Sequence, residues 1–505
     1  MKNPTLYIVS FLALFYFVGA GLLAVHAPIT HDEFFTLHLS LLPNLGTLWQ
    51  ALRETIDFHP PLHFALTRYP LLGLGISPLS LRLISLLSGF VFLLGIFSIL
   101  KRKLPLPYAL MGALIPMATH PYHYFFTARS YMLMLALVTW GTYFWLQGRQ
   151  EKRLTGSHLA MAFCFFLASS AHYYAVLAFA APLGAEAFLI LKRRKIYWPT
   201  LTALTLSALA SFFFLLPFAI AAREFSGTFW GHAGLRSLWE TYNFFLGEKT
   251  AILWMALLLI FFLPLPFRRR SPSPTQTVNT QWETDEILCF SILALMPFIA
   301  VTLSALTHAG FTHRYVLITI SGLSILIATL THWRLQNRPL RIQWGLTTML
   351  IWTALLWTKD YQWMSEQKGL IIRDVNELLA YGSKREPIVI GQYDIFMQYQ
   401  FYAPREERNR IVFINSKRFA KLYTDNKDCS FASEALLDFS KVAVNPKDFL
   451  KDQTDFPCLL SQLDRETPAL LHVTHKTPLN WRVGDYQLYR CYSTPSAETQ
   501  LSLQP

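Results

Sequence analysis

Long apolar stretches recur through the first 358 residues, and they constrain the fold more than any motif does. Eleven of them approach the length that an α-helix needs to cross a bilayer, about 20 residues. They cover 5–25, 78–100, 106–124, 130–147, 158–172, 173–191, 199–222, 251–267, 286–307, 314–332 and 342–358. This succession predicts an α-helical polytopic membrane protein with about 11 transmembrane helices.

The distribution of charge divides the chain near Trp357. Charged residues make up 15% of the sequence, against about 25% in an ordinary soluble domain, and they are sparse before Trp357 and common after it. We therefore expect a transmembrane domain over 1–358 and a small α/β extracytoplasmic domain over 359–505. The second domain alternates a helical stretch and polar segments with short β-branched runs, at 371–380, 388–390, 411–414, 442–444 and 470–473.

The basic residues predict the orientation of the chain. Clusters of Lys and Arg fall in every second connection, at 101–103, 149–153, 192–195, 268–270 and 334–341. Because such clusters stay in the cytoplasm, the N-terminus is predicted to be cytoplasmic, with 26–77 and 359–505 outside. We interpret 5–25 as an uncleaved anchor rather than a signal peptide, since this topology needs its helix. The net charge of +13 then belongs to loops beside membrane lipids, and nucleic acid is not an expected partner.

The five cysteines favour a structural interpretation. Cys164 and Cys289 lie in apolar stretches and are expected to act as small apolar residues. Cys429, Cys458 and Cys491 lie in the predicted outer domain, where an oxidising compartment would permit one disulfide. The sequence leaves open whether it joins Cys458 to Cys491 or Cys429 to Cys458.

The outward connections collect polar side chains that a passive surface does not need. Charges beside a membrane span cost free energy unless they are solvated, paired or used. The adjacent carboxylates of Asp32 and Glu33 therefore suggest a catalytic base, a metal ligand or an ion site. Candidates for substrate binding at the same boundary are His59, Arg82, Arg129, Tyr131, His172, Tyr173, Arg314 and Tyr315.

The order of these motifs resembles that of a known family. Asp32-Glu33 after the first span, a His-Pro-Pro-Leu motif at 59–62 and the stretch 79–85 resemble the polytopic GT-C glycosyltransferases. The nearest branch is the protein-mannosyltransferase and aminoarabinose-transferase group, to whose later motifs 128–131, 172–173 and 314–315 are similar. Ser130 departs from the pattern, because many relatives carry proline there.

The resemblance implies a polyprenyl-phosphate sugar donor, used at the outer face with inversion at the anomeric carbon. Attack by an acceptor hydroxyl needs an ionised base within hydrogen-bond reach, and Asp32 is the candidate, with Glu33 as an orienting or second carboxylate. The phosphate leaving group needs charge stabilisation, which Arg129 and Arg314 could supply through bidentate contacts, with Arg82 a weaker candidate. The expected setting is a bacterial cytoplasmic membrane. The acceptor is a cell-envelope glycolipid, a polysaccharide or a secreted protein.

Structural roles compete with each of these assignments. Asp32 and Glu33 could start or cap a helix, and the prolines after His59 could form a turn that re-enters the membrane. Arg129 and the motifs at 172–173 and 314–315 could anchor at the interface, and Arg82 could pair within the bundle.

Other function classes also remain open at this point. The histidines and carboxylates would suit zinc or another divalent ion (Mg or Mn), although no spacing is diagnostic. The same polar residues could line the pathway of a transporter or lipid flippase. Transporters, however, place such groups near mid-membrane and often show two related halves. A non-catalytic sensor would leave the first-loop motif without a role.

Overall fold

The computed structural model contains two compact units, and each is described by itself. One unit comprises Met1–Val25 and Phe58–Tyr361, and the other His26–Asp57 and Gln362–Pro505. The predicted first loop, 26–77, is therefore divided between them. The structure describes residues 4–223, 234–247, 250–262, 281–307, 310–335, 338–381, 386–414, 449, 453, 455–461, 471 and 473–493.

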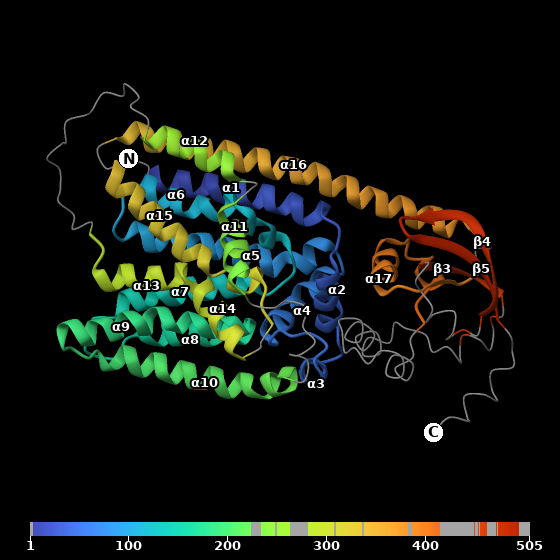
Figure 1. Ribbon diagram of the computed structural model, residues 1–505, viewed down its shortest axis with the longest axis horizontal. Coiled ribbons are helices and arrows are strands. Elements are labelled where there is room, and N and C mark those ends of the chain that lie inside the picture. The colour runs from blue at the N-terminus through green and yellow to red at the C-terminus, as the bar shows by residue number, and fades with distance from the viewer. Residues whose placement is uncertain are drawn as a thin grey trace. The chain divides into compact units, whose positions relative to one another are not determined.

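The first unit is a bundle of helices that run side by side (Figure 1). Its elements are α1 (Pro4–His26), α4 (Leu62–Leu74), α5 (Pro78–Lys101), α6 (Leu106–Ala118), η1 (His120–Phe126), α7 (Tyr131–Gly148), α8 (Gly156–Ala171), η2 (Tyr173–Phe179), α9 (Ala180–Arg193), α10 (Trp198–Arg223), α11 (Leu235–Leu246), α12 (Ala251–Phe262), α13 (Thr284–Ala294), α14 (Met296–Thr307), η5 (His313–Val316), α15 (Thr319–Leu335) and the first part of α16 (Pro339–Leu379). Large apolar side chains such as Phe212 and Leu258 are exposed on its surface, as expected of a bundle surrounded by lipid.

The helices that could cross a membrane are fewer than the sequence predicts. Among the described residues, four are long and apolar enough, namely Tyr7–His26, Pro78–Lys101, Tyr173–Arg193 and Trp198–Ala221. The number rises to six if the bent pairs α11–α12 and α13–α14 each count as one span. The predicted count of about 11 is therefore not confirmed. One reason is visible at 106–124, where α6 ends at Ala118 and the tighter 3₁₀-helix η1 takes over.

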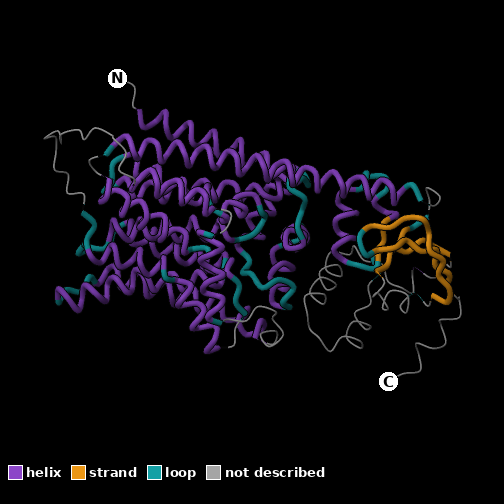
Figure 2. Tube along the Cα trace, turned by 45° about the horizontal axis from the view of Figure 1, so that its top comes forward, coloured by secondary structure: helices purple, strands orange, loops and turns teal. Residues whose placement is uncertain are grey.

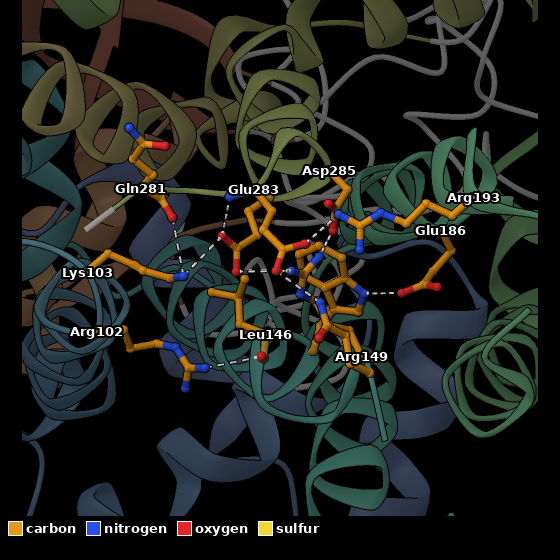
Figure 3. A network of polar contacts seen from close by, with 12 residues as sticks. Arg102, Lys103, Leu146, Arg149, Glu186, Arg193, Gln281, Glu283 and Asp285 are labelled. Carbon is orange, nitrogen blue, oxygen red and sulfur yellow. Dashed lines mark hydrogen bonds and ion pairs between the residues drawn. The ribbon is translucent and has the colours of Figure 1, made fainter. Parts of the chain in front are cut away.

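A network of charged side chains around Arg149 links several helices of the bundle (Figure 3). Arg149, which follows α7, is paired with Asp285 and lies 3.3 Å from carboxylate oxygens of Glu283 and Glu286. Glu186 on α9 accepts a hydrogen bond from the indole of Trp145 (2.9 Å). The network therefore ties the end of α7 to the start of α13, and a neighbouring bond ties α7 to α9.

The second unit holds a five-stranded sheet of order β2-β1-β3-β5-β4, drawn in orange in Figure 2. Its strands are β1 (Ile388–Ile390), β2 (Ile411–Val412), β3 (Asp455–Ser461), β4 (Val473–Val483) and β5 (Tyr486–Ser493), and its other elements are α2 (His31–Ser40), α3 (Leu45–Arg53), the end of α16, α17 (Tyr393–Tyr402) and η6 (Arg408–Arg410). β1 is parallel to β2 and β3, whereas β5 is antiparallel to β3 and β4. The β-branched runs at 388–390 and 411–412 form strands as predicted, while 442–444 lies outside the described residues.

The first loop contributes α2 to this second unit through specific polar contacts. His31 on α2 pairs with Asp394 on α17, and the backbone amide of Ile29 donates to the hydroxyl of Tyr402 (3.0 Å). These contacts explain why 26–57 groups with the C-terminal residues despite the distance in sequence.

Two of the outer-domain cysteines are buried thiols on neighbouring strands. Cys458 on β3 and Cys491 on β5 belong to the core of the sheet, and they are thiols rather than the disulfide that the sequence allowed between them. A hydrogen bond from Cys458 lowers the pKa of the Cys491 thiol. Cys429 lies outside the described residues, so its predicted pairing with Cys458 is not described.

Candidate functional site

Histidine and tyrosine rings from four segments of the first unit converge on His172. His172 stands between α8 and η2, and its ring centroid lies 5.0 Å from that of His59, which precedes α4. Tyr131, the first residue of α7, is 5.2 Å away, and Tyr315 of η5 is 5.6 Å away. The structure thus gathers four of the predicted substrate-binding residues into one cluster.

Arg129 joins this cluster through His59. Its guanidinium donates a hydrogen bond to Nδ1 of His59 over 2.8 Å, and both side chains are buried. Because arginine has no acceptor, Nδ1 must be the unprotonated nitrogen of the imidazole. Through this bond Arg129 therefore donates to a neutral imidazole.

The backbone around Arg129 is fixed from two sides. Ser85 on α5 donates its hydroxyl to the carbonyl of Arg129 (3.2 Å), and the Arg129 amide donates to the carbonyl of Thr127 (2.7 Å). Arg82 lies one turn before Ser85 and is almost fully buried. It donates to the carbonyl of Ala24 (2.7 Å), one of the last four carbonyls of α1, which no helix partner satisfies. Arg82 thus has the structural role that the sequence left open.

The 3₁₀-helix before Arg129 is anchored to α16. Asp360 accepts a hydrogen bond from the hydroxyl of Tyr122 and lies 3.3 Å from Nε2 of His123. Burial raises the pKa of the Asp360 carboxyl. The hydroxyl of Thr127 closes the segment by donating to the carbonyl of His123 (2.8 Å). The contacts of Asp360 join residues too far apart in sequence for any motif to show them.

Arg314 enters the cluster from η5, beside Tyr315. Arg314 immediately precedes Tyr315, whose ring packs on His172, and Arg129 is bonded to His59, whose ring does the same, so two cationic residues border the cluster. The ring of Tyr315 also packs against that of Tyr174, with 5.0 Å between the centroids, and Tyr174 donates to the carbonyl of Gly310 (2.7 Å). Tyr174 therefore ties η5 to η2.

Tyr173 is the first residue of η2 and is half-buried. The turn that contains it is set by its neighbour, because Nδ1 of His172 accepts from the amide of Tyr174 (3.2 Å).

Three hydroxyl groups at this site are buried without a partner. Those of Ser130, Tyr131 and Thr312 form no hydrogen bond with any residue that the structure describes. A buried polar group left in this state costs about 1–3 kcal/mol. The site therefore has hydrogen-bonding capacity that a polar ligand or ordered water would satisfy. Thr312 was not singled out by sequence reasoning, and Ser130 was noted only as a departure from the family pattern.

Asp32 and Glu33 lie in the second unit, within the first turn of α2. Glu33 is fully buried and forms a capping box, accepting from the amide (3.0 Å) and the hydroxyl (3.1 Å) of Thr30. Helix capping is the structural role that the sequence suggested for Glu33 as an alternative to catalysis. Asp32 is half-buried and takes no part in the capping box, and the N-terminus of a helix stabilises a negative charge such as its ionised carboxylate.

The residues described here do not form a metal-binding group. No three His, Cys, Asp or Glu side chains come together in a way that could hold an ion, within the described part of the chain. The zinc, magnesium or manganese considered from the sequence therefore has no identified ligands.

Solved structures show which fold this is. No protein-family model matches the sequence, and no curated protein resembles it at a significant level. ArnT from Cupriavidus metallidurans bound to undecaprenyl phosphate is similar in structure, with a TM-score of 0.57 at 13% identity over 97% of this chain and 98% of that one. The apo form of the same protein gives 0.59 at 12% identity, over 96% and 97%. ArnT is an aminoarabinose transferase of the GT-C superfamily, so the fold predicted from the motifs is confirmed.

Proposed function

We propose that this chain, which has the GT-C fold, is an integral membrane glycosyltransferase that moves a monosaccharide from a polyprenyl-phosphate carrier to an acceptor outside the cytoplasm. The observation that carries the proposal is the cluster around His172, where Arg129 and Arg314 accompany buried hydroxyls that have no partner among the described residues. Two cations and several donors suit a phosphate group, and the similar ArnT was solved with a lipid phosphate bound.

The proposed reaction exchanges one bond at the anomeric carbon for another. The acceptor hydroxyl forms a bond to this carbon, its proton passes to Asp32, and the bond to the phosphate oxygen breaks with inversion. The electron pair of the broken bond stays on the phosphate, which gains negative charge. Arg129 and Arg314 stabilise this charge most strongly in the transition state, which is how such contacts accelerate a reaction.

The proposed setting is the cytoplasmic membrane of a bacterium, with the N-terminus inside and the α/β domain in the periplasm. The positions of the basic clusters support this orientation. The acceptor is a periplasmic cell-envelope glycolipid, a polysaccharide or a protein.

The test is transfer of label from a panel of radiolabelled polyprenyl-phosphate sugars to an envelope extract. Membranes would contain wild type, Asp32→Asn, Arg129→Gln or the control Arg236→Gln. Arg236 is an exposed arginine on α11, and its ion pair among the described residues is an exposed i,i+4 contact with Glu240. We expect transfer by wild type and the control, and loss of about two orders of magnitude or more for the other two variants. Near-normal transfer by Asp32→Asn would remove Asp32 from the base role. Near-normal transfer by Arg129→Gln would contradict the phosphate site.

A further inference from the structure

Two of the buried hydroxyls stand beside the two arginines, and each lies in a different segment. Ser130 follows Arg129 directly, and Thr312 precedes Arg314 by two residues. Both residues are nearly inaccessible, with 2% and 6% of their surface exposed, and neither hydroxyl has a partner among the described residues.

Their position in the chain makes this lack of a partner unusual. Ser130 precedes α7 and Thr312 precedes η5, the position where a hydroxyl normally accepts from an amide of the first turn. Neither side chain forms that capping bond. Both elements start without the help of these hydroxyls, so their local structure does not explain why polar atoms are buried there.

Hydroxyls inside a helix differ in this respect. The Thr142 hydroxyl on α7 donates to the carbonyl of Val138 (2.9 Å), and a helical serine or threonine can reach such a carbonyl by rotating about χ1. Thr139, also buried without a described partner, has this option. Ser130 and Thr312 precede their helices, so the carbonyls three and four residues before them do not belong to the same helix.

We propose that Ser130 and Thr312 are binding residues for the phosphate of the lipid-linked sugar, each donating its hydroxyl proton to a phosphate oxygen beside Arg129 or Arg314. This assignment rests on the proposed function. A phosphate group presents more acceptor sites than two guanidinium groups fill, and neutral donors add hydrogen bonds without adding charge. The burial of both hydroxyls is then explained by a ligand that satisfies them.

The experiment measures binding of a radiolabelled polyprenyl phosphate that carries no sugar, using purified full-length protein. The variants are Ser130→Ala and Thr312→Val, with Thr139→Val as a matched control that also removes a buried hydroxyl. Thr312→Ser keeps the hydroxyl and should bind within about twofold of wild type. We expect each of the first two changes to raise Kd about tenfold or more, the effect of losing a hydrogen bond to a charged group. Thr139→Val should bind like wild type.

Competition identifies the part of the ligand that these hydroxyls contact. The corresponding prenol, which lacks the phosphate, should compete equally weakly in all variants. Inorganic phosphate should compete less well against Ser130→Ala and Thr312→Val than against wild type, if the hydroxyls contact the phosphate itself. Equal competition by inorganic phosphate in every variant would contradict this contact.

The outcomes separate this inference from the function on which it rests. If wild type binds the lipid phosphate and Arg129→Gln weakens binding, while Ser130→Ala and Thr312→Val bind like wild type, the inference is wrong and ordered water satisfies the hydroxyls. If folded wild type does not bind, or Arg129→Gln binds equally well, the proposed phosphate site itself is wrong. The elution profile of each variant in detergent establishes that it is folded.

Discussion

Replacing Arg149 by methionine should destabilise the first unit strongly, because Arg149 is the centre of the network in Figure 3. Its side chain is 3% exposed and pairs with carboxylates of Asp285, which is 1% exposed, and Glu286, which is 5% exposed. Methionine would fill much of the volume but leave two buried carboxylates without their main cation.

The size of this effect follows from which partners remain solvated. Glu283 is about one-third exposed and is also paired with Arg193 (2.9 Å), so it adds little. Glu286 keeps a distant partner in Lys103 (3.9 Å). The carboxylate of Asp285, left without its cation, therefore accounts for most of the lost stability. Removing one member of a buried ion pair costs about 3–5 kcal/mol. Arg193→Met is the matched control, because its exposed pair is worth only about 0–1 kcal/mol.

The assay is the midpoint of unfolding in detergent, compared for wild type, Arg149→Met, Arg193→Met and a triple variant. The triple variant adds Asp285→Asn and Glu286→Gln to Arg149→Met, and it should recover part of the lost stability because these two side chains no longer carry a buried charge. Folded Arg149→Met should keep its transfer activity, since α7 places about 27 Å between Arg149 and Tyr131. Equal stability of Arg149→Met and Arg193→Met would refute this reasoning.

Three further predictions concern the site and its support. Arg129→Lys should reduce transfer at least tenfold, because lysine cannot hold His59 and a phosphate with a planar fork; steady-state kinetics with the identified donor test this, and unchanged kcat/KM would contradict it. Gly322→Ala should lower the free energy of unfolding by about 1–3 kcal/mol, and with it the unfolding midpoint, because a β-carbon there would lie 2.6 Å from the carbonyl oxygen of Phe290, a backbone atom that cannot easily move; Gly21→Ala, where nothing lies within 4 Å, is the control. Burial and the nearby charge of Arg314 lower the pKa of His313 below its usual 6.5. The unfolded chain then binds more protons than the folded chain, so the free energy of unfolding should fall as the pH drops below about 6.5. His313→Gln should flatten this pH dependence, and an identical pH profile would show that His313 does not cause it.

The fold was predictable because membrane helices are long and apolar. The residues at which each helix begins and ends were not predictable in the same way. The predicted span at 106–124 contains an α-helix of only 13 residues, because the 3₁₀-helix η1 follows α6 within it, and the predicted span at 173–191 begins with the 3₁₀-helix η2. Apolar composition cannot distinguish an α-helix from a 3₁₀ turn that is equally buried.

Some features of the candidate site follow from local sequence patterns, whereas others depend on contacts between residues far apart in the chain. His59, Arg129, Tyr131, His172 and Tyr315 were selected because polar residues beside spans are costly, and the structure brings them together. The helix-capping alternative for Glu33 has a local signal, since Thr30-His31-Asp32-Glu33 has the spacing of a capping box. The bond of Arg82 to Ala24 and that of Tyr122 to Asp360 depend on tertiary contacts, for which a single sequence holds no local signal.

The cluster around His172 also has a consequence for the biogenesis of the protein. About half the chain separates His59 from Tyr315, and both are needed to complete it. While the chain is being synthesised, Arg129 and His172 must therefore enter the membrane before η5 exists. Unpaired polar groups are costly in lipid, so early helices should stay near the insertion machinery, or in contact with water, until α14 and η5 have emerged. Chains that stop before η5 should then be degraded rather than accumulate as stable partial bundles.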